Sequence, residues 1–245
     1  MNFYYGFLSL NLEYFIYAHV IFVVFGFIIF LVAGIEMILL PMFSVSHKFS
    51  AKFIKVSYIF LSVSIFGLVF SKFLDLFYLF LLSFLLFLSG IISLLLQVLE
   101  IYRHKPKKRS DFALNGMFLS HVFLPVGIAM FFVDKSTGLF ITSSLFFGVL
   151  IYSSLYKILP FLTWFHKFSN IVGIKPVPTL SEMLPENFPR LQLILHVIGS
   201  ILFSLFFTFK FLLFYYTGLV MLFISGVIFL YNFIYVITYQ LKEGG

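Results

Sequence analysis

Apolar runs of about 18 residues or more recur along the whole chain, separated by short polar stretches. A helix of this length crosses the roughly 30 Å hydrocarbon core of a bilayer. Hydrophobic residues make up 62% of the chain and charged residues 10%, too little polar surface to cover a water-soluble globule. The sequence therefore predicts an all-α fold, a polytopic bundle of membrane helices. We expect one transmembrane domain over residues 1–245, because no polar stretch is long enough to fold alone.

Seven spans are expected, over about 12–41, 53–70, 76–102, 112–133, 139–165, 191–209 and 211–239. Lys and Arg test this division, because cytoplasmic loops are enriched in them. Twelve lie after the first, third, fifth and seventh spans, whereas three lie on the other side, at Lys72, Lys135 and Lys210. The asymmetry predicts an N-terminus outside and a C-terminus in the cytoplasm. Since topology accounts for the basic residues, we expect no nucleic-acid partner.

The longest loop, residues 166–190, is expected on the cytoplasmic side. Its segment KPVPTLSEMLPENFPR holds four prolines, so it cannot form one helix. Thr179 and Glu182 have the spacing of a capping box, which opens a short helical turn. The loop is either a structured connection back into the membrane or a docking site for a cytoplasmic partner.

Lys157 is a cation inside the span expected over 139–165. A lysine costs roughly 2.5 to 3.5 kcal/mol at the centre of an inserted helix, which makes it a candidate functional residue. Counting about 1.5 Å per residue places Lys157 and Glu36 each about 8 to 9 Å in from the cytoplasmic ends of their helices. Because ionisable groups buried in a bilayer pair with one another, Glu36 is the expected partner of Lys157.

The same count places His121, His196 and Asn232, from three further spans, near this depth. We therefore predict one intramembrane polar site, formed by side chains from five helices. In the span expected over 191–209, four polar residues follow one another at every fourth position: Gln192, His196, Ser200 and Ser204. This spacing predicts a stripe on one helical face, which is either a ligand site or a hydrogen-bonding contact between helices.

Three prolines lie inside expected spans, each close after a polar residue: Pro41, Pro125 and Pro160. A proline in a helix leaves the carbonyl four residues earlier without its hydrogen bond. Backbone irregularities are therefore expected beside Glu36, His121 and Lys157.

The chain contains no cysteine, which excludes disulfides, thiolate chemistry and covalent haem attachment. Neither a phosphate-binding loop nor a nucleophile elbow nor a His-Glu-x-x-His motif occurs. No residue is therefore named as catalytic, and whether the protein is an enzyme is left open.

The stretch AHVIFVVFGFIIFLVAGIEMILLPMF, at residues 18–43, resembles the histidine helix of the catalytic subunit of haem-copper oxidases and of the related NnrS-like haem proteins. The span over 139–165 has a similar ending, YKILPF, and the matching residues in the first stretch are His19, Gly26, Phe27, Gly34, Leu40 and Pro41. The resemblance implies a non-covalent haem b between helices, electron transport in a respiratory chain or nitrogen-oxide handling, and a bacterial inner membrane.

If haem is present, the expected axial ligands of its iron are His121 and His196, whose predicted depths differ by less than one helical turn. Gln192 and Ser200 lie one turn either side of His196 and would orient its ring. His19 is the rival ligand, because the resemblance points to it.

Two other functions fit the same residues. A small transporter or permease would use the intramembrane polar residues as its substrate site. An assembly or structural subunit would use them as contacts between helices. The expected partners are the lipid bilayer and either further membrane subunits or a redox partner.

Overall fold

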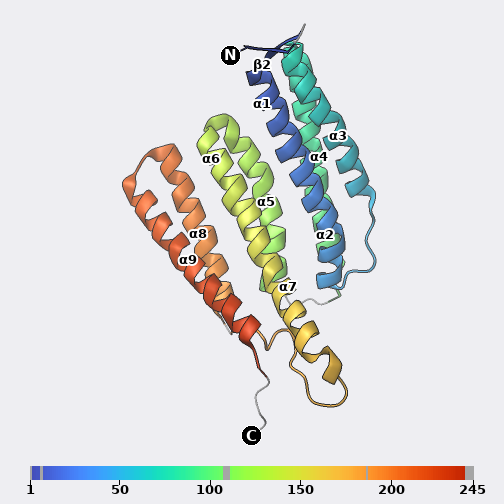
Figure 1. Cartoon of the computed structure of the whole chain (residues 1–245), viewed down its shortest axis with the longest axis vertical. Coiled ribbons are helices and arrows are strands. Elements are labelled where there is room, and N and C mark those ends of the chain that lie inside the picture. Colours follow the sequence, from blue (N-terminus) through green and yellow to red (C-terminus); the bar gives the residue numbers. More distant parts are fainter. Residues whose placement is uncertain (1, 6–7, 107–110, 186, 241–245) are drawn as a thin grey trace. The chain divides into compact units, whose positions relative to one another are not determined.

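Seven helices long and apolar enough to cross a membrane run through the computed structural model, which describes residues 2–5, 8–106, 111–185 and 187–240 (Figure 1). Each expected span falls on one of them: Leu12–Ser44, Lys52–Phe73, Phe77–Arg103, Phe112–Phe131, Lys135–Ile171, Phe188–Phe209 and Leu212–Thr238. The chain is therefore an integral membrane protein of the all-α class, which confirms the predicted fold. It consists of two compact units, Met1–Lys108 and Arg109–Gly245, described separately below. The single transmembrane domain stays a prediction.

The first unit contains three spans. A short antiparallel pair of strands, β1 (Asn2–Tyr5) and β2 (Leu8–Asn11), precedes them and was not predicted. The first span comprises α1 (Leu12–Val20), the π-helix η1 (Ile21–Ile28) and α2 (Ile29–Ser44). The next two are α3 (Lys52–Phe73) and α4 (Phe77–Arg103). These two pack closely at Gly90, where a Cβ atom would lie 2.8 Å from Cγ of Leu61.

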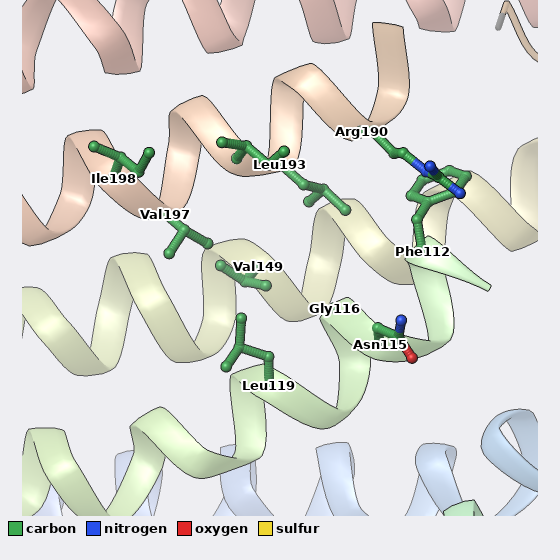
Figure 2. A pocket seen from close by; sticks show the side chains of 10 residues that line it. Phe112, Asn115, Gly116, Leu119, Val149, Arg190, Leu193, Val197 and Ile198 are labelled. Atoms are coloured by element: carbon green, nitrogen blue, oxygen red, sulfur yellow. The ribbon is translucent and has the colours of Figure 1, made fainter. Parts of the chain in front are cut away.

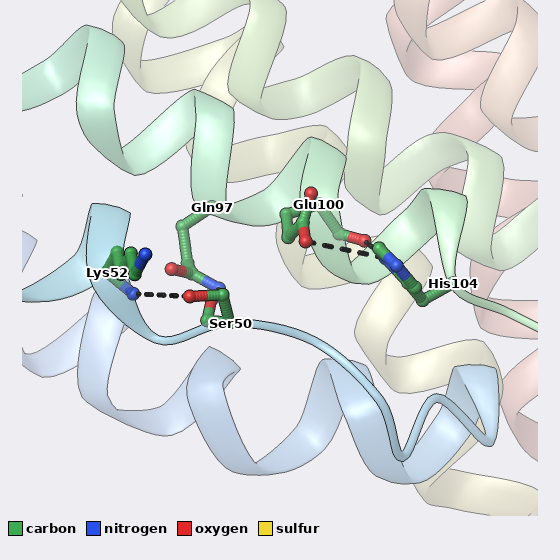
Figure 3. Close-up of polar contacts among 5 residues, drawn as sticks. All are labelled: Ser50, Lys52, Gln97, Glu100 and His104. Carbon is green, nitrogen blue, oxygen red and sulfur yellow. Dashed lines mark hydrogen bonds and ion pairs between the residues drawn. The ribbon is translucent and has the colours of Figure 1, made fainter.

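A buried glutamine ties the segment before α3 to α4 (Figure 3). The Gln97 side chain is fully buried, and its Nε2 donates to the carbonyl of Ser50 at 2.9 Å. Its Oε1 accepts from the backbone N–H of Ile54 at 3.0 Å. One side chain therefore satisfies an N–H in the first turn of α3, which has no partner within its own helix. Near the end of α4, His104 Nδ1 lies 3.6 Å from the Glu100 carboxylate.

The second unit contains four spans. The first is α5 (Phe112–Val133), and the second comprises α6 (Lys135–Phe140), the π-helix η2 (Ile141–Gly148), α7 (Val149–Phe168) and the 3-10 turn η3 (Ser169–Ile171). The last two are α8 (Phe188–Phe209) and α9 (Leu212–Thr238). We call the second of these four, which runs from α6 to η3, the fifth span.

Short polar side chains and glycines fix the ends and contacts of these helices. Asp111 caps α5 by accepting from Ala113 N at 2.9 Å, and Asp134 caps α6 by accepting from Thr137 N at 2.8 Å. Between α8 and α9, a Cβ on Gly218 would lie 2.9 Å from the carbonyl oxygen of Gly199. The absence of side chains there lets the two backbones approach closely, as small residues do in membrane helix pairs.

The irregular turns do not lie where the prolines led us to expect them. Pro41, Pro125 and Pro160 all lie inside regular α-helices. The two π-helical segments in the described helices each contain one glycine instead, Gly26 in η1 and Gly148 in η2. A proline has a helix-compatible φ and lacks one backbone donor, so these three helices keep their α-helical assignment around it.

The loop after the fifth span is folded against its own unit. Glu182 Oε2 accepts from Thr179 N at 2.8 Å, and Glu182 N donates to the Thr179 carbonyl at 3.1 Å, forming the single turn that the capping-box spacing predicted. Met183 is fully buried, and Trp164 Nε1 donates to the Pro178 carbonyl at 2.9 Å. The loop is therefore a structured connection, and the docking of a partner on it stays a prediction.

Candidate functional site

Lys157 forms an ion pair with Asp111, the residue that caps α5. The two side chains are 23% and 36% exposed, so the pair lies at the edge of the bundle and not in its centre. The expected partner, Glu36, is buried in α2 of the first unit, and its pairing with Lys157 stays a prediction. The sequence carried a signal for Asp111 that we did not use: an aspartate directly before an apolar helix is a typical N-cap.

A hydrogen-bonded group of four side chains joins the fifth span, α8 and α9. The Tyr156 hydroxyl donates to Gln192 Oε1 at 3.1 Å and accepts from Asn232 Nδ2 at 2.8 Å. Gln192 Nε2 donates to Ser225 Oγ at 2.9 Å, and Ser225 Oγ donates to the Gln192 carbonyl at 3.1 Å. All four residues are buried. Gln192 and Asn232 of the predicted five-helix polar site thus lie in one hydrogen-bonded group, and Tyr156 is the link that sequence reasoning missed. The five-helix site itself stays a prediction.

His196 lies one helical turn further along α8, against the π-helix η2. Its Nε2 lies 3.0 Å from the Ser144 carbonyl oxygen, and its ring meets the Tyr152 ring edge-on at 4.9 Å between centroids. Because a carbonyl can only accept, Nε2 carries the hydrogen of this bond, which leaves Nδ1 as the acceptor when the ring is neutral. A Cβ on Gly148 would lie 2.7 Å from Nε2, so the glycine in η2 makes the room for this ring.

The stripe continues beyond His196 toward the other end of the bundle. Ser200 Oγ lies 2.7 Å from Ser144 Oγ, and Ser204 Oγ donates to the carbonyl of Ile201 at 2.7 Å. Thr208 continues the spacing of four residues along α8. Its Oγ1 lies 3.2 Å from Oγ1 of Thr137 in the fifth span. The polar stripe of α8 therefore consists of five residues: Gln192, His196, Ser200, Ser204 and Thr208. All except Ser204 bond to the fifth span.

Asp134 lies close to the end of the polar stripe that is marked by Thr208. Thr137 donates to its carboxylate twice, through Oγ1 at 2.5 Å and through the backbone N–H at 2.8 Å. These two bonds favour the ionised carboxylate, and they hold the pKa of Asp134 below its ordinary value of 3.8. Because Thr137 also meets Thr208, the carboxylate is connected to the last residue of the polar stripe.

His121 and His196 lie on different sides of the fifth span. His121 is buried in α5, its Nδ1 lies 2.8 Å from the Met117 carbonyl oxygen, and its ring meets the Phe146 ring at 5.6 Å. His196 meets Ser144 and Gly148 of the same π-helix. Residue 146 is about half a turn from residues 144 and 148, so it faces the opposite side of the helix.

These positions do not fit a haem shared by the two histidines, because the backbone of η2 lies between their rings. The rival ligand, His19, is exposed on α1 of the first unit. Within the residues that the structure describes, no group of three or more His, Asp or Glu side chains could hold a metal ion. Haem binding is therefore a prediction that rests on the resemblance alone.

No protein-family model, no curated protein and no solved structure matches the chain.

Proposed function

We propose that this integral membrane protein is a proton-linked transporter or permease of a bacterial inner membrane, and that the polar stripe of α8 is its pathway. The observation that carries the proposal is the stripe itself. Polar side chains occupy every fourth position from Gln192 to Thr208, and the residues between them are apolar or glycine. Polar and ionisable groups are expensive in a bilayer and mark ion and proton pathways.

The chemistry of the stripe supports protons as the transported or coupling species. His196 is the one ionisable side chain among the five, and its imidazole can accept a proton on one ring nitrogen and release one from the other. Hydroxyl groups of Ser and Thr both donate and accept, so they can pass a proton along a hydrogen-bonded row. Successive members lie about 6 Å apart along the helix axis, so the proposed pathway requires a water molecule to enter between them.

Two adjacent serines give a matched test. Ser144 bonds to Ser200 of the stripe, whereas Ser143 is exposed and, among the residues that the structure describes, its hydroxyl bonds only to the carbonyl of Phe140. We expect Ser144→Ala to slow voltage-driven proton entry into liposomes, measured with a trapped pH dye, and Ser143→Ala to leave it unchanged. Equal rates for the two variants would reject the pathway.

The assembly-subunit alternative uses the same hydrogen bonds as contacts between helices. It requires Ser144→Ala to lower the melting temperature in detergent, and it allows no proton flux through the wild-type protein. A cytochrome requires a Soret band in protein purified with adequate haem supply, abolished by a substitution of His19, His121 or His196. Flux without a Soret band supports the transporter, whereas a histidine-dependent Soret band would replace it with the cytochrome.

A further inference from the structure

A groove of about 350 Å³ runs along the second unit between α5 and α8, and none of the five residues of the polar stripe lines it (Figure 2). Its walls are Phe112, Gly116 and Leu119 of α5 and Leu193, Val197 and Ile198 of α8, with Val149 between them. All of these residues lie within membrane-spanning helices. The groove is therefore apolar and lies at membrane depth, where lipid and not water surrounds the protein.

Glycine shapes one part of this groove. A Cβ on Gly116 would lie 2.1 Å from Oγ of Ser153 and 3.4 Å from Cδ1 of Leu193. The missing side chain therefore lets α5 lie against the fifth span and leaves space beside Leu193. The volume falls in the range of about 300 to 1,000 Å³ that small-molecule sites occupy.

One end of the groove carries positive charge. Arg190 and Asn115 lie at the end where both α5 and α8 begin, and Ile198 lies toward the other end (Figure 2). Within the residues described, Arg190 makes neither an ion pair nor a side-chain hydrogen bond. The nearest carboxylate along α5, that of Asp111, is already paired with Lys157. Asn187, the N-cap residue of α8, makes no capping hydrogen bond with its side chain, and the N–H groups of the first turn add partial positive charge at this end.

A cation at the membrane boundary followed by an apolar groove matches one ligand chemistry, a head group of net negative charge joined through its phosphate to an acyl chain; a zwitterionic head group carries its own cation and fits less well. Guanidinium groups bind phosphate through parallel hydrogen bonds. On the expected topology this end faces the cytoplasmic leaflet, where anionic lipids gather. We propose that the groove binds one acyl chain of an anionic glycerophospholipid, with the lipid phosphate on Arg190. The inference does not depend on the polar stripe or on proton transport.

Native mass spectrometry of the purified full chain tests this site, with phosphatidylglycerol and phosphatidylcholine as the two probes. We expect one phosphatidylglycerol to bind in preference to phosphatidylcholine, and Arg190→Ala to weaken its binding by about tenfold or more. Leu119→Trp, which fills the groove from an exposed position, should also displace the lipid. Lys175→Ala is the matched control, because it removes an exposed cation of the neighbouring loop.

Three results would overturn the proposal. The first is equal binding of the two lipids. The second is that Lys175→Ala weakens the binding of phosphatidylglycerol as much as Arg190→Ala does. The third is a lipid-free dimer that Leu119→Trp dissociates, which would show that a second copy of the chain covers the groove. A melting curve for each variant separates lost binding from lost fold.

Discussion

At the scale of single residues, the Tyr156 hydroxyl is the group on which the inner part of the polar cluster depends. Tyr156→Phe leaves Gln192 Oε1 without the hydroxyl donor and Asn232 Nδ2 without its acceptor, both in buried positions. We expect a loss of about 1 to 3 kcal/mol in the free energy of unfolding. Tyr152→Phe is the control, because the described structure gives the Tyr152 hydroxyl no hydrogen bond. Equal melting temperatures in detergent for the two variants would contradict the network.

The ion pair of Lys157 makes a second residue-scale prediction. A double-mutant cycle of Lys157→Met with Asp111→Asn should show a coupling of about 0.5 to 3 kcal/mol in the free energy of unfolding, because the residues are in direct contact. The cycle of Lys157→Met with Glu36→Gln tests the partner expected from the sequence. Coupling to Glu36 with none to Asp111 would restore the original pairing.

At the scale of elements, we predict that close packing against the π-helix η2 keeps the ring of His196 in place. Gly148→Ala would place a methyl group 2.7 Å from Nε2 and 3.3 Å from Cε1 of His196. Since the ring must then move off the Ser144 carbonyl, we expect a cost of about 1 to 3 kcal/mol in the free energy of unfolding. Gly226→Ala in α9, where a Cβ meets nothing within 4 Å, should cost nothing. If thermal unfolding shows both variants as stable as wild type, the close packing at η2 is wrong.

The start of α6 gives an element-scale prediction that depends on pH. The cap of Asp134 lowers the pKa of this carboxyl on folding, so its stabilising effect is complete above the unfolded value, near 3.8. The effect is lost as the pH falls through the lower folded value. The difference in melting temperature between wild type and Asp134→Ala should therefore be constant near neutral pH and shrink in acid. A difference that grows as the pH falls would contradict the assigned bonds.

At the scale of the whole molecule, the apolar runs and the loop charges were enough to predict seven spans, because span length is set by the bilayer. The spacing of four likewise predicted the stripe from Gln192 to Ser204. Partners across helices were harder to predict, since hydrogen bonds such as Tyr156 to Gln192 depend on how helices turn toward one another. The partner of Lys157 was hard to predict for the same reason, because Asp111 lies 46 residues earlier in the chain. The π-helix that ends at Gly148 was also missed, since no proline lies in it.

If the polar stripe of α8 carries protons, the protein must speed voltage-driven proton entry into liposomes, and the rate of this entry can be measured directly. His196→Phe removes the one ionisable group of the stripe, while Ile194→Phe alters an exposed apolar residue on the same helix. The account predicts that wild type and Ile194→Phe acidify the liposome interior faster than empty liposomes, and that His196→Phe does not. Wild-type liposomes no faster than empty ones, or His196→Phe liposomes as fast as wild type, would contradict it.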